Sequence, residues 1–195
     1  PLVATLASSI VIGGVSFVLT QGLLITVTDT AFKSLGQGSV GGVRYQILIW
    51  LGFAIVCGIV LAFTSFGRHI YAAGGNPEAA RLSGIRVGVV RTSTYALSGF
   101  AAGLAGVLAT SQVATGQADA GAPLALGAVA AIVVGGTSIW GGEGAVWRTV
   151  LGVLLLSLIG NGFNLLQVDP TYQQILQGLI ILGAVGVDAW TRRAR

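Results

Sequence analysis

The chain has 195 residues, of which 54% are hydrophobic and only 8% charged, and its formal net charge is +4. Soluble domains carry about 25% charged residues, so this composition cannot cover a globular surface and indicates lipid as the surrounding medium. The basic residues are scattered along the chain without an aromatic-rich stripe, which argues against nucleic acid. A single cysteine, Cys57, excludes an internal disulfide. The chain contains no Met and begins at Pro1, so we expect a fragment or processed form of a longer protein.

A helix that crosses a bilayer core needs about 20 mostly apolar residues. The sequence predicts five such segments and a sixth of about half that length, which runs into a glycine-rich stretch. In chain order, the predicted spans are residues 5–28, 47–66, 92–111, 124–134 (the short one), 145–166 and 172–190. The polar stretches 29–46 and 112–123 are predicted to be loops. We therefore expect an all-α, polytopic transmembrane helical bundle with about six spans, one of them short or broken, forming a single domain over residues 1–195.

The basic residues favour one orientation of this bundle. With six spans, eight of the ten Lys and Arg residues fall on the side that holds both termini, and two (Lys33 and Arg44) fall on the other. Because Lys and Arg are enriched in cytoplasmic loops, we expect both termini of this sequence to be cytoplasmic. If residues 124–134 did not cross, the balance would become four against six, so the charges themselves favour six spans.

Charges are densest in a polar island, residues 68–86, which Arg91 follows closely. Within it, Asn76-Pro77-Glu78 predicts a helix start, because Asn is a preferred N-cap, Pro is favoured at the first helical position and an acid complements the helix dipole. Gly84 stands where a helix terminator is expected. A helix of one to two turns is unstable alone in water, so it must dock on the membrane body or on a partner. From spacing alone, a simple capped loop between two spans is an equal alternative.

The glycine-rich residues 135–144 carry no Gly-Lys-Ser/Thr sequence, and Lys33 is the only lysine. A phosphate-binding loop for ATP is therefore not expected, and close packing beside a broken helix is the favoured interpretation. His69 is the only histidine and has no metal-binding pattern around it. No nucleophile with a nearby base is apparent in the spans, so an enzyme is poorly supported.

The predicted spans hold no ionisable residue far from their ends, whereas ion-coupled transporters usually carry one along their path. A neutral solute needs amides, hydroxyls and aromatic faces instead. The polar candidates for a translocation path are Gln112, Asn161 and Asn164, together with Gln21. For each of them, a hydrogen bond between packed helices is an alternative role.

The segment from Gly67 to Ile85 closely resembles the cytoplasmic loop of permease subunits of ribose-type monosaccharide ABC importers. The resemblance covers essentially the whole chain and corresponds to the C-terminal portion of a family member. It continues, in the family's order, through residues 95–99, 130–138, 141–144, 161–166 and 173–181. In one departure, this chain has Glu143 where many relatives carry a basic residue, which puts in doubt any role of charge there.

The resemblance implies a bacterial plasma (inner) membrane permease that imports a monosaccharide such as ribose, xylose or galactose. Its implied partners are a second permease copy, two cytoplasmic ATPase subunits that hydrolyse the ATP, and a periplasmic or lipid-anchored sugar-binding protein; no cofactor is expected in this chain. Residues 67–91 would be a cytoplasmic coupling loop. The implied ATPase-coupling residues are Gly74, Gly75, Asn76, Glu78, Ala79, Ala80, Arg81 and Gly84. The alternatives are a secondary transporter or facilitator of a small polar solute without an ATPase, and a membrane scaffold without transport.

Overall fold

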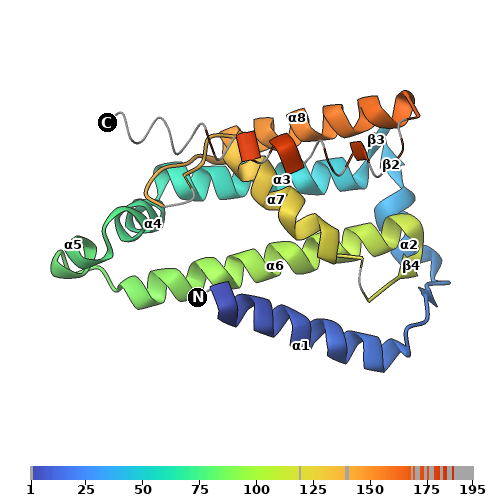
Figure 1. Ribbon diagram of the computed structural model, residues 1–195, viewed down its shortest axis with the longest axis horizontal. Helices are drawn as coiled ribbons and strands as arrows, with labels where there is room; N and C mark the ends of the chain where they lie inside the picture. The colour runs from blue at the N-terminus through green and yellow to red at the C-terminus, as the bar shows by residue number, and fades with distance from the viewer. Residues whose placement is uncertain are drawn as a thin grey trace. The chain divides into compact units, whose positions relative to one another are not determined.

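A computed structural model of the chain (Figure 1) describes residues 2–118, 120–138, 141–167, 169, 172–173, 175, 178–180, 182–183 and 186. These residues form two compact units, each considered by itself below. Unit 1 comprises residues 1–51 and 97–124, and unit 2 comprises residues 52–96 and 125–195. Among the described residues, the regular structure is almost entirely helical, with four two-residue strands, as the composition predicts.

Three helices in the described part of the chain are long and apolar enough to cross a membrane: α3 (Tyr45–Phe63), α6 (Val87–Val113) and α8 (Val146–Leu165). No residue of α3 is buried within the chain, although nearly all of its side chains are apolar. A helix that is hydrophobic on all sides belongs in a core or in lipid. These helices confirm the predicted spans 47–66, 92–111 and 145–166, with ends that differ by a few residues.

The first predicted span, residues 5–28, was too long. Helix α1 (Leu2–Thr20) ends at Thr20, where Gln21 adopts a left-handed φ of 53°. The Gln21 and Gly22 amides then donate to the carbonyls of Val18 and Phe17, the paired bonds of a Schellman helix end. The apolar run continues beyond Thr20, so hydropathy alone could not locate this end.

In unit 1, the stretch 29–46 was predicted to be a loop, but it contains regular structure. It contains α2 (Thr30–Gln37), capped by the Asp29 carboxylate, which accepts from the Ala31 amide at 2.8 Å. Strands β2 (Ser39–Val40) and β3 (Val43–Arg44) form an antiparallel hairpin. The turn between them is Gly41-Gly42 with φ of 59° and 83°, the backbone that a two-residue hairpin requires.

The remaining strands of unit 1, β1 (Ile25–Thr26) and β4 (Thr115–Gly116), pair antiparallel. β4 lies inside the predicted loop 112–123, which therefore holds a strand as well as the last residues of α6. Helix α2 packs on this end of α6. The fully buried Ser111 hydroxyl donates to the Phe32 carbonyl at 2.6 Å, and a Cβ on Gly36 would overlap the Ser111–Gln112 backbone.

In unit 2, the polar island forms two consecutive helices, α4 (Ser65–Gly75) and α5 (Pro77–Leu82). The predicted short helix after Asn76 is confirmed, whereas the helix before it was not anticipated. Thr64 ends α3 and caps α4, because its hydroxyl donates to the Val60 carbonyl at 2.6 Å and accepts from the Gly67 amide at 3.2 Å. The second predicted span therefore stops at Phe63 instead of residue 66.

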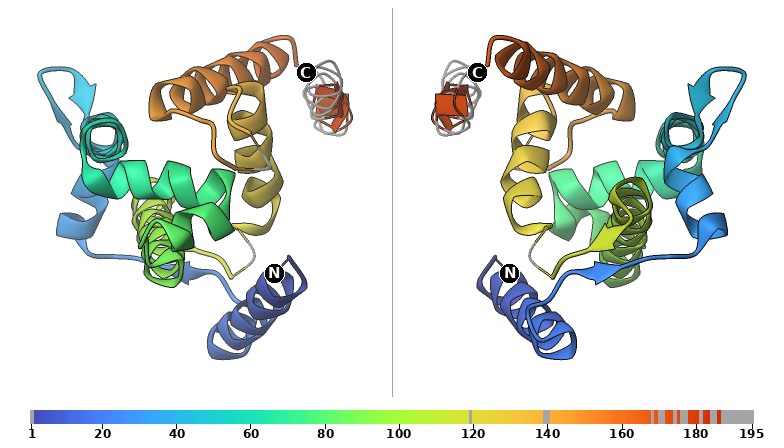
Figure 2. Two further views of the ribbon diagram at one scale, coloured as in Figure 1. Left: turned by 90° about the vertical axis from the view of Figure 1, so that its left-hand side faces the viewer. Right: turned by 90° about the vertical axis from the view of Figure 1, so that its right-hand side faces the viewer.

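Helix α7 (Ala122–Val134) confirms the predicted short segment. In unit 2 it meets α8 at an angle (Figure 2), and the backbone of α8 approaches that of α7 at Gly152. A Cβ on Gly152 of α8 would overlap the Ala131 carbonyl of α7 and lie 2.8 Å from the Gly135 nitrogen. Ala130, Ala131 and Val133 are among the few buried apolar residues of the described chain. The last predicted span, residues 172–190, lies largely outside the described residues.

Candidate functional site

Helix α5 forms the tip of the polar island and is built as the sequence predicts. The Asn76 carboxamide oxygen accepts from the amides of Glu78 and Ala79, at 3.1 and 3.0 Å, and Pro77 occupies the first turn. At the other end Gly84 has a left-handed φ of 83°. The Gly84 and Ile85 amides donate to the carbonyls of Arg81 and Ala80, which completes a Schellman end.

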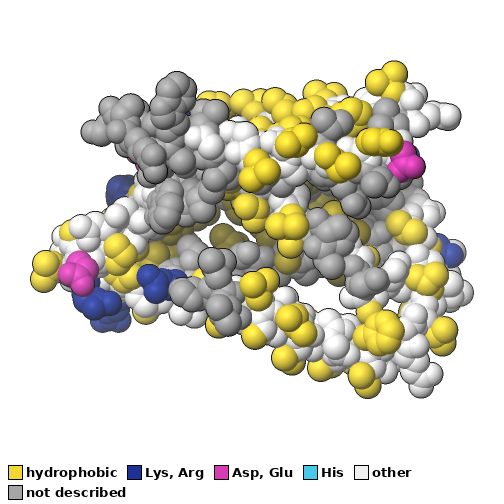
Figure 3. Space-filling view, in the orientation of Figure 1, with side chains coloured by type: hydrophobic (Ala, Val, Ile, Leu, Met, Phe, Trp, Pro, Cys, Tyr) yellow, Lys and Arg dark blue, Asp and Glu magenta, His cyan; other side chains and the backbone are white. Residues whose placement is uncertain are grey.

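One side of α5 faces the protein and the other is open. Ala80 is buried, with 4% of its surface exposed, as are Val87 and Val90 at the start of α6. Ala80 therefore docks α5 on the rest of unit 2. The resemblance had grouped Ala80 with the coupling residues. On the open side, Glu78, Ala79 and Arg81 are exposed. Figure 3 shows acidic and basic side chains gathered over α5 and the adjoining helix ends.

Leu82 is the residue that sequence reasoning missed. It lies at the end of α5 with 90% of its surface exposed, the highest exposure among the large apolar side chains of the described residues. A single exposed leucine is common on protein surfaces, so Leu82 is informative only together with Glu78 and Arg81, which are exposed on the same short helix. A leucine flanked by Arg81 and Ser83 was a signal in the sequence, but Leu82 and Ala80 could be assigned to opposite sides only once the docking of α5 was known.

The predicted coupling residues Gly74 and Gly75, at the end of α4, lie against Gly141 and Gly142 of the glycine-rich segment. A Cβ on Gly74 would lie 2.9 Å from the Gly142 nitrogen, and a Cβ on Gly142 would lie 2.8 Å from the Gly75 Cα. Gly141 and Gly142 have left-handed φ values of 94° and 78°. We call these four glycines the glycine clasp. It confirms the favoured interpretation of the segment as a place of close packing.

Tyr71, one turn before the clasp on α4, donates its hydroxyl to the Gly144 carbonyl at 2.6 Å. This bond joins two segments 73 positions apart in sequence. His69, on the same helix, is exposed, and no group of three or more potential metal ligands occurs among the residues described.

The predicted path residues are divided between the two units, and each is described within its own unit. Gln112 belongs to unit 1, where its carbonyl accepts from the Gln37 side chain at 3.2 Å. Asn161 and Asn164 belong to α8 in unit 2. The Asn164 side-chain oxygen accepts a hydrogen bond from the side-chain nitrogen of Gln173 at 3.1 Å. Gln21 is exposed at the end of α1. Their proposed role in a path stays a prediction.

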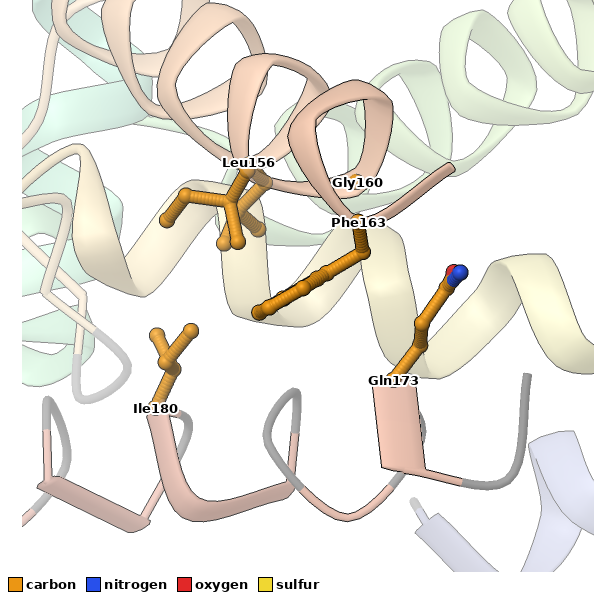
Figure 4. A pocket seen from close by; sticks show the side chains of 6 residues that line it. Leu156, Gly160, Phe163, Gln173 and Ile180 are labelled. Atoms are coloured by element: carbon orange, nitrogen blue, oxygen red, sulfur yellow. The ribbon is translucent and has the colours of Figure 1, made fainter. Parts of the chain in front are cut away.

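A small pocket in unit 2 lies beside these α8 residues (Figure 4). Its lining residues are Leu156, Ile159, Gly160, Phe163, Gln173 and Ile180. Its volume of about 50 Å³ is far below the roughly 300–1,000 Å³ of typical ligand sites. A larger hollow of about 330 Å³, lined by residues that include Gly136, Trp147 and Arg148, is open to the exterior. The small pocket is therefore too small to be a sugar site by itself.

Comparison with known proteins identifies the chain's relatives. Residues 1–185 match the family described as "Branched-chain amino acid transport system / permease component". The ribose import permease protein RbsC of Haemophilus influenzae is 41% identical over 190 residues, which are 95% of this chain and 59% of that protein. RbsC of Bacillus subtilis is 40% identical over 96% of this chain and 59% of its own length. The L-arabinose permease AraH of Escherichia coli is 34% identical over 100% of this chain and 59% of its own length.

The chain thus spans a little under three fifths of the length of these curated relatives, and no solved structure matches it. The match to the family extends over all of the helices described above, from α1 to α8. The apolar spans and the near-complete match together show that this chain belongs to the family of transport-system permease components that includes the ribose-type sugar permeases.

Proposed function

We propose that this chain is part of the membrane permease of an ATP-driven importer that carries a monosaccharide into a bacterial cell. The names of the similar permeases, for ribose and L-arabinose, favour a pentose over a branched-chain amino acid. In this proposal the chain pairs with a second permease copy in the inner membrane. A binding protein delivers the sugar on the outer face, and separate ATPase subunits act on the cytoplasmic face.

The observation that carries this proposal is the construction of α5. It is a capped helix of six residues between α4 and the apolar helix α6. It docks through Ala80, while Glu78, Arg81 and Leu82 remain exposed. An apolar anchor with charges of both signs beside it suits a groove on a protein. We assign this open side to the ATPase subunit, and residues 67–91 to the cytoplasmic face.

The proposal is tested in the complete transporter, reconstituted in proteoliposomes with its ATPase and binding protein. We expect Leu82→Asp and Glu78→Arg to abolish ATP-dependent sugar uptake and the stimulation of ATP hydrolysis by the loaded binding protein. Membrane insertion should be retained, because both residues lie outside the spans. Lys33→Glu, a charge change on α2, serves as the control and should leave both activities near those of the parent.

The outcome separates the proposal from its alternative. Sugar uptake that needs no ATP and survives both α5 substitutions would establish a facilitator without an ATPase. Uptake of leucine or valine with no uptake of ribose or L-arabinose would overturn the sugar assignment while leaving the permease assignment intact.

A further inference from the structure

The glycine clasp brings two backbones together with no side chain between them. Gly74, on α4, is in helical conformation, and a Cβ there would lie 2.9 Å from a backbone nitrogen. Contacts under about 3 Å are not tolerated by real Cβ atoms, so even alanine at Gly74 would displace the opposing loop. We therefore expect the opposing loop to move together with the end of α4, because the two backbones are in direct contact and no flexible side chain lies between them.

On one side, the clasp is joined to α5 by a single residue. The Asn76 amide donates to the Ala72 carbonyl of α4, while the Asn76 side chain caps α5. One residue thus closes the first helix and opens the second, with no flexible linker between them. A force on the open side of α5 reaches Gly74 and Gly75 through a short, hydrogen-bonded joint.

On the other side, the glycine-rich segment that contains Gly141 and Gly142, called the clasp loop below, is fixed to α7 and α8. Gly136, with φ of 80°, ends α7, and the Gly136 and Thr137 amides donate to the carbonyls of Val133 and Ile132. The Ser138 amide donates to the Glu143 carbonyl at 3.0 Å, which closes the loop on itself. Figure 1 shows this segment passing the end of α4 before it enters α8.

Two further contacts tie the loop to its neighbours. Tyr71 of α4 donates to the Gly144 carbonyl, two residues before α8 begins at Val146. At the opposite end of the loop, Gly135 lies against the Arg148 carbonyl of α8. Any displacement of the loop therefore reaches the end of α7 and the start of α8 together.

We propose that the glycine clasp, with Tyr71 as its latch, transmits movement of α5 to α7 and α8, so that ATP hydrolysis is converted into reorientation of these helices. The inference rests on the proposed function, because it assigns to the clasp the step between ATPase contact and sugar movement. The clasp glycines and Tyr71 are positioning residues, since they act through the helices that they join. A purely structural role would lower stability without changing the sugar carried per ATP hydrolysed.

The experiment measures uptake and hydrolysis together in the reconstituted transporter, with ribose or L-arabinose as the probe sugar. Gly74→Ala should lower the sugar carried per ATP by about tenfold in a complex that still binds its ATPase. Gly75→Ala should lower it much less, because its added Cβ would make only an ordinary contact, 3.8 Å from the Gly142 Cα. Tyr71→Phe, which removes one hydroxyl and adds no bulk, should lower the ratio several-fold.

Tyr95→Phe is the control for Tyr71→Phe. Tyr95 is an exposed tyrosine of α6, and the ratio should stay at that of the parent. If Gly74→Ala prevents assembly, Tyr71→Phe decides the question by itself. An unchanged ratio in the assembled Tyr71→Phe transporter would overturn the clasp inference. A parent transporter that shows no ATP-dependent uptake at all would overturn the proposed function instead, so the two failures are distinguishable.

Discussion

At the scale of single residues, Asn76 joins the two helices of the polar island. Its amide satisfies a carbonyl of α4, and its side chain satisfies two amides of α5. A helix of six residues has few internal hydrogen bonds, so its end groups decide whether it forms. The short helix therefore depends on this one carboxamide.

Replacing Asn76 by alanine should cost about 1 kcal/mol of local stability, the usual cost of losing an N-cap. The amides of Glu78 and Ala79 should exchange with solvent several-fold faster, which hydrogen exchange of the solubilised protein measures. Asn76→Asp keeps the acceptor and should preserve the protection. Equal exchange in the alanine variant would show that docking alone maintains α5.

The sequence predicts these local features well because they depend on neighbours in the chain. Asn, Pro and Gly at their positions specify the start and end of α5 without reference to any other segment. The exposure of Leu82 and the burial of Ala80 depend instead on where α5 docks. The docking position of α5 is a tertiary contact, which local sequence patterns do not predict.

At the scale of helices and strands, α8 meets α7 where Gly152 of α8 lies against the Ala131 carbonyl of α7 and against Gly135, the residue that follows α7. Small residues at such crossings let backbones approach closely, which is a main source of helix association in lipid. The Gly135–Gly152 contact lies at the end of α7, beside the clasp loop. It therefore supports the same loop that we assign to transmission.

Gly152→Ala should destabilise the protein by about 1–3 kcal/mol, the usual cost of overpacking, because its Cβ would overlap the α7 backbone. Thermal unfolding in detergent, followed by loss of monodisperse protein, measures the change. Gly160→Ala is the matched control on the same helix, because no atom of the described residues lies within 4 Å of the Cβ it would add. An equal loss in both variants would indicate an effect of glycine replacement in α8 rather than of the crossing.

The contact between α2 and α6 gives a second test at this scale. Ser111→Ala removes the buried hydroxyl that bonds the Phe32 carbonyl, and it should cost about 1 kcal/mol. Ser8→Ala removes an exposed hydroxyl that bonds the Thr5 carbonyl within α1 and should cost less than half of that. The same thermal assay compares the two, and equal midpoints would contradict the assigned role of Ser111.

Long apolar helices were predictable because their signal extends over many residues, and α3, α6 and α8 were found on that basis. Helix α2 was missed because eight residues with Lys33, Gly36 and Gln37 show no apolar run. It is held by Asp29 and by docking on α6, and the second of these is a tertiary contact. The end of α1 was missed because Gln21, a residue seldom found at positive φ, takes the place of the expected glycine.

At the scale of the whole molecule, the arrangement of charges along the chain predicts its orientation in the membrane. Arg44 directly precedes α3, and Arg68 and Arg81 follow it. If α3 crosses the bilayer, these flanks must lie on opposite faces. The excess of arginines in the polar island favours the cytoplasm for that side.

Cysteine labelling tests this orientation. In a Cys57→Ala background, Arg81→Cys should react with a membrane-impermeant maleimide only in inside-out vesicles. Arg44→Cys should react only in intact spheroplasts. The parent cysteine lies within α3 and should react with the reagent from neither side. Labelling of both engineered cysteines from the same side would contradict a crossing by α3.

The bend at Thr64 has a consequence for where the polar island can lie. A break in a helix normally leaves carbonyls and amides that must find water, which would hold the break away from hydrocarbon. The Thr64 hydroxyl serves one group on each side of this break, donating to the Val60 carbonyl and accepting from the Gly67 amide. Because a helix end leaves up to four such groups, those that the hydroxyl does not reach still need water. If α3 crosses the bilayer, the break therefore belongs at the membrane surface, and α4 lies outside the hydrocarbon.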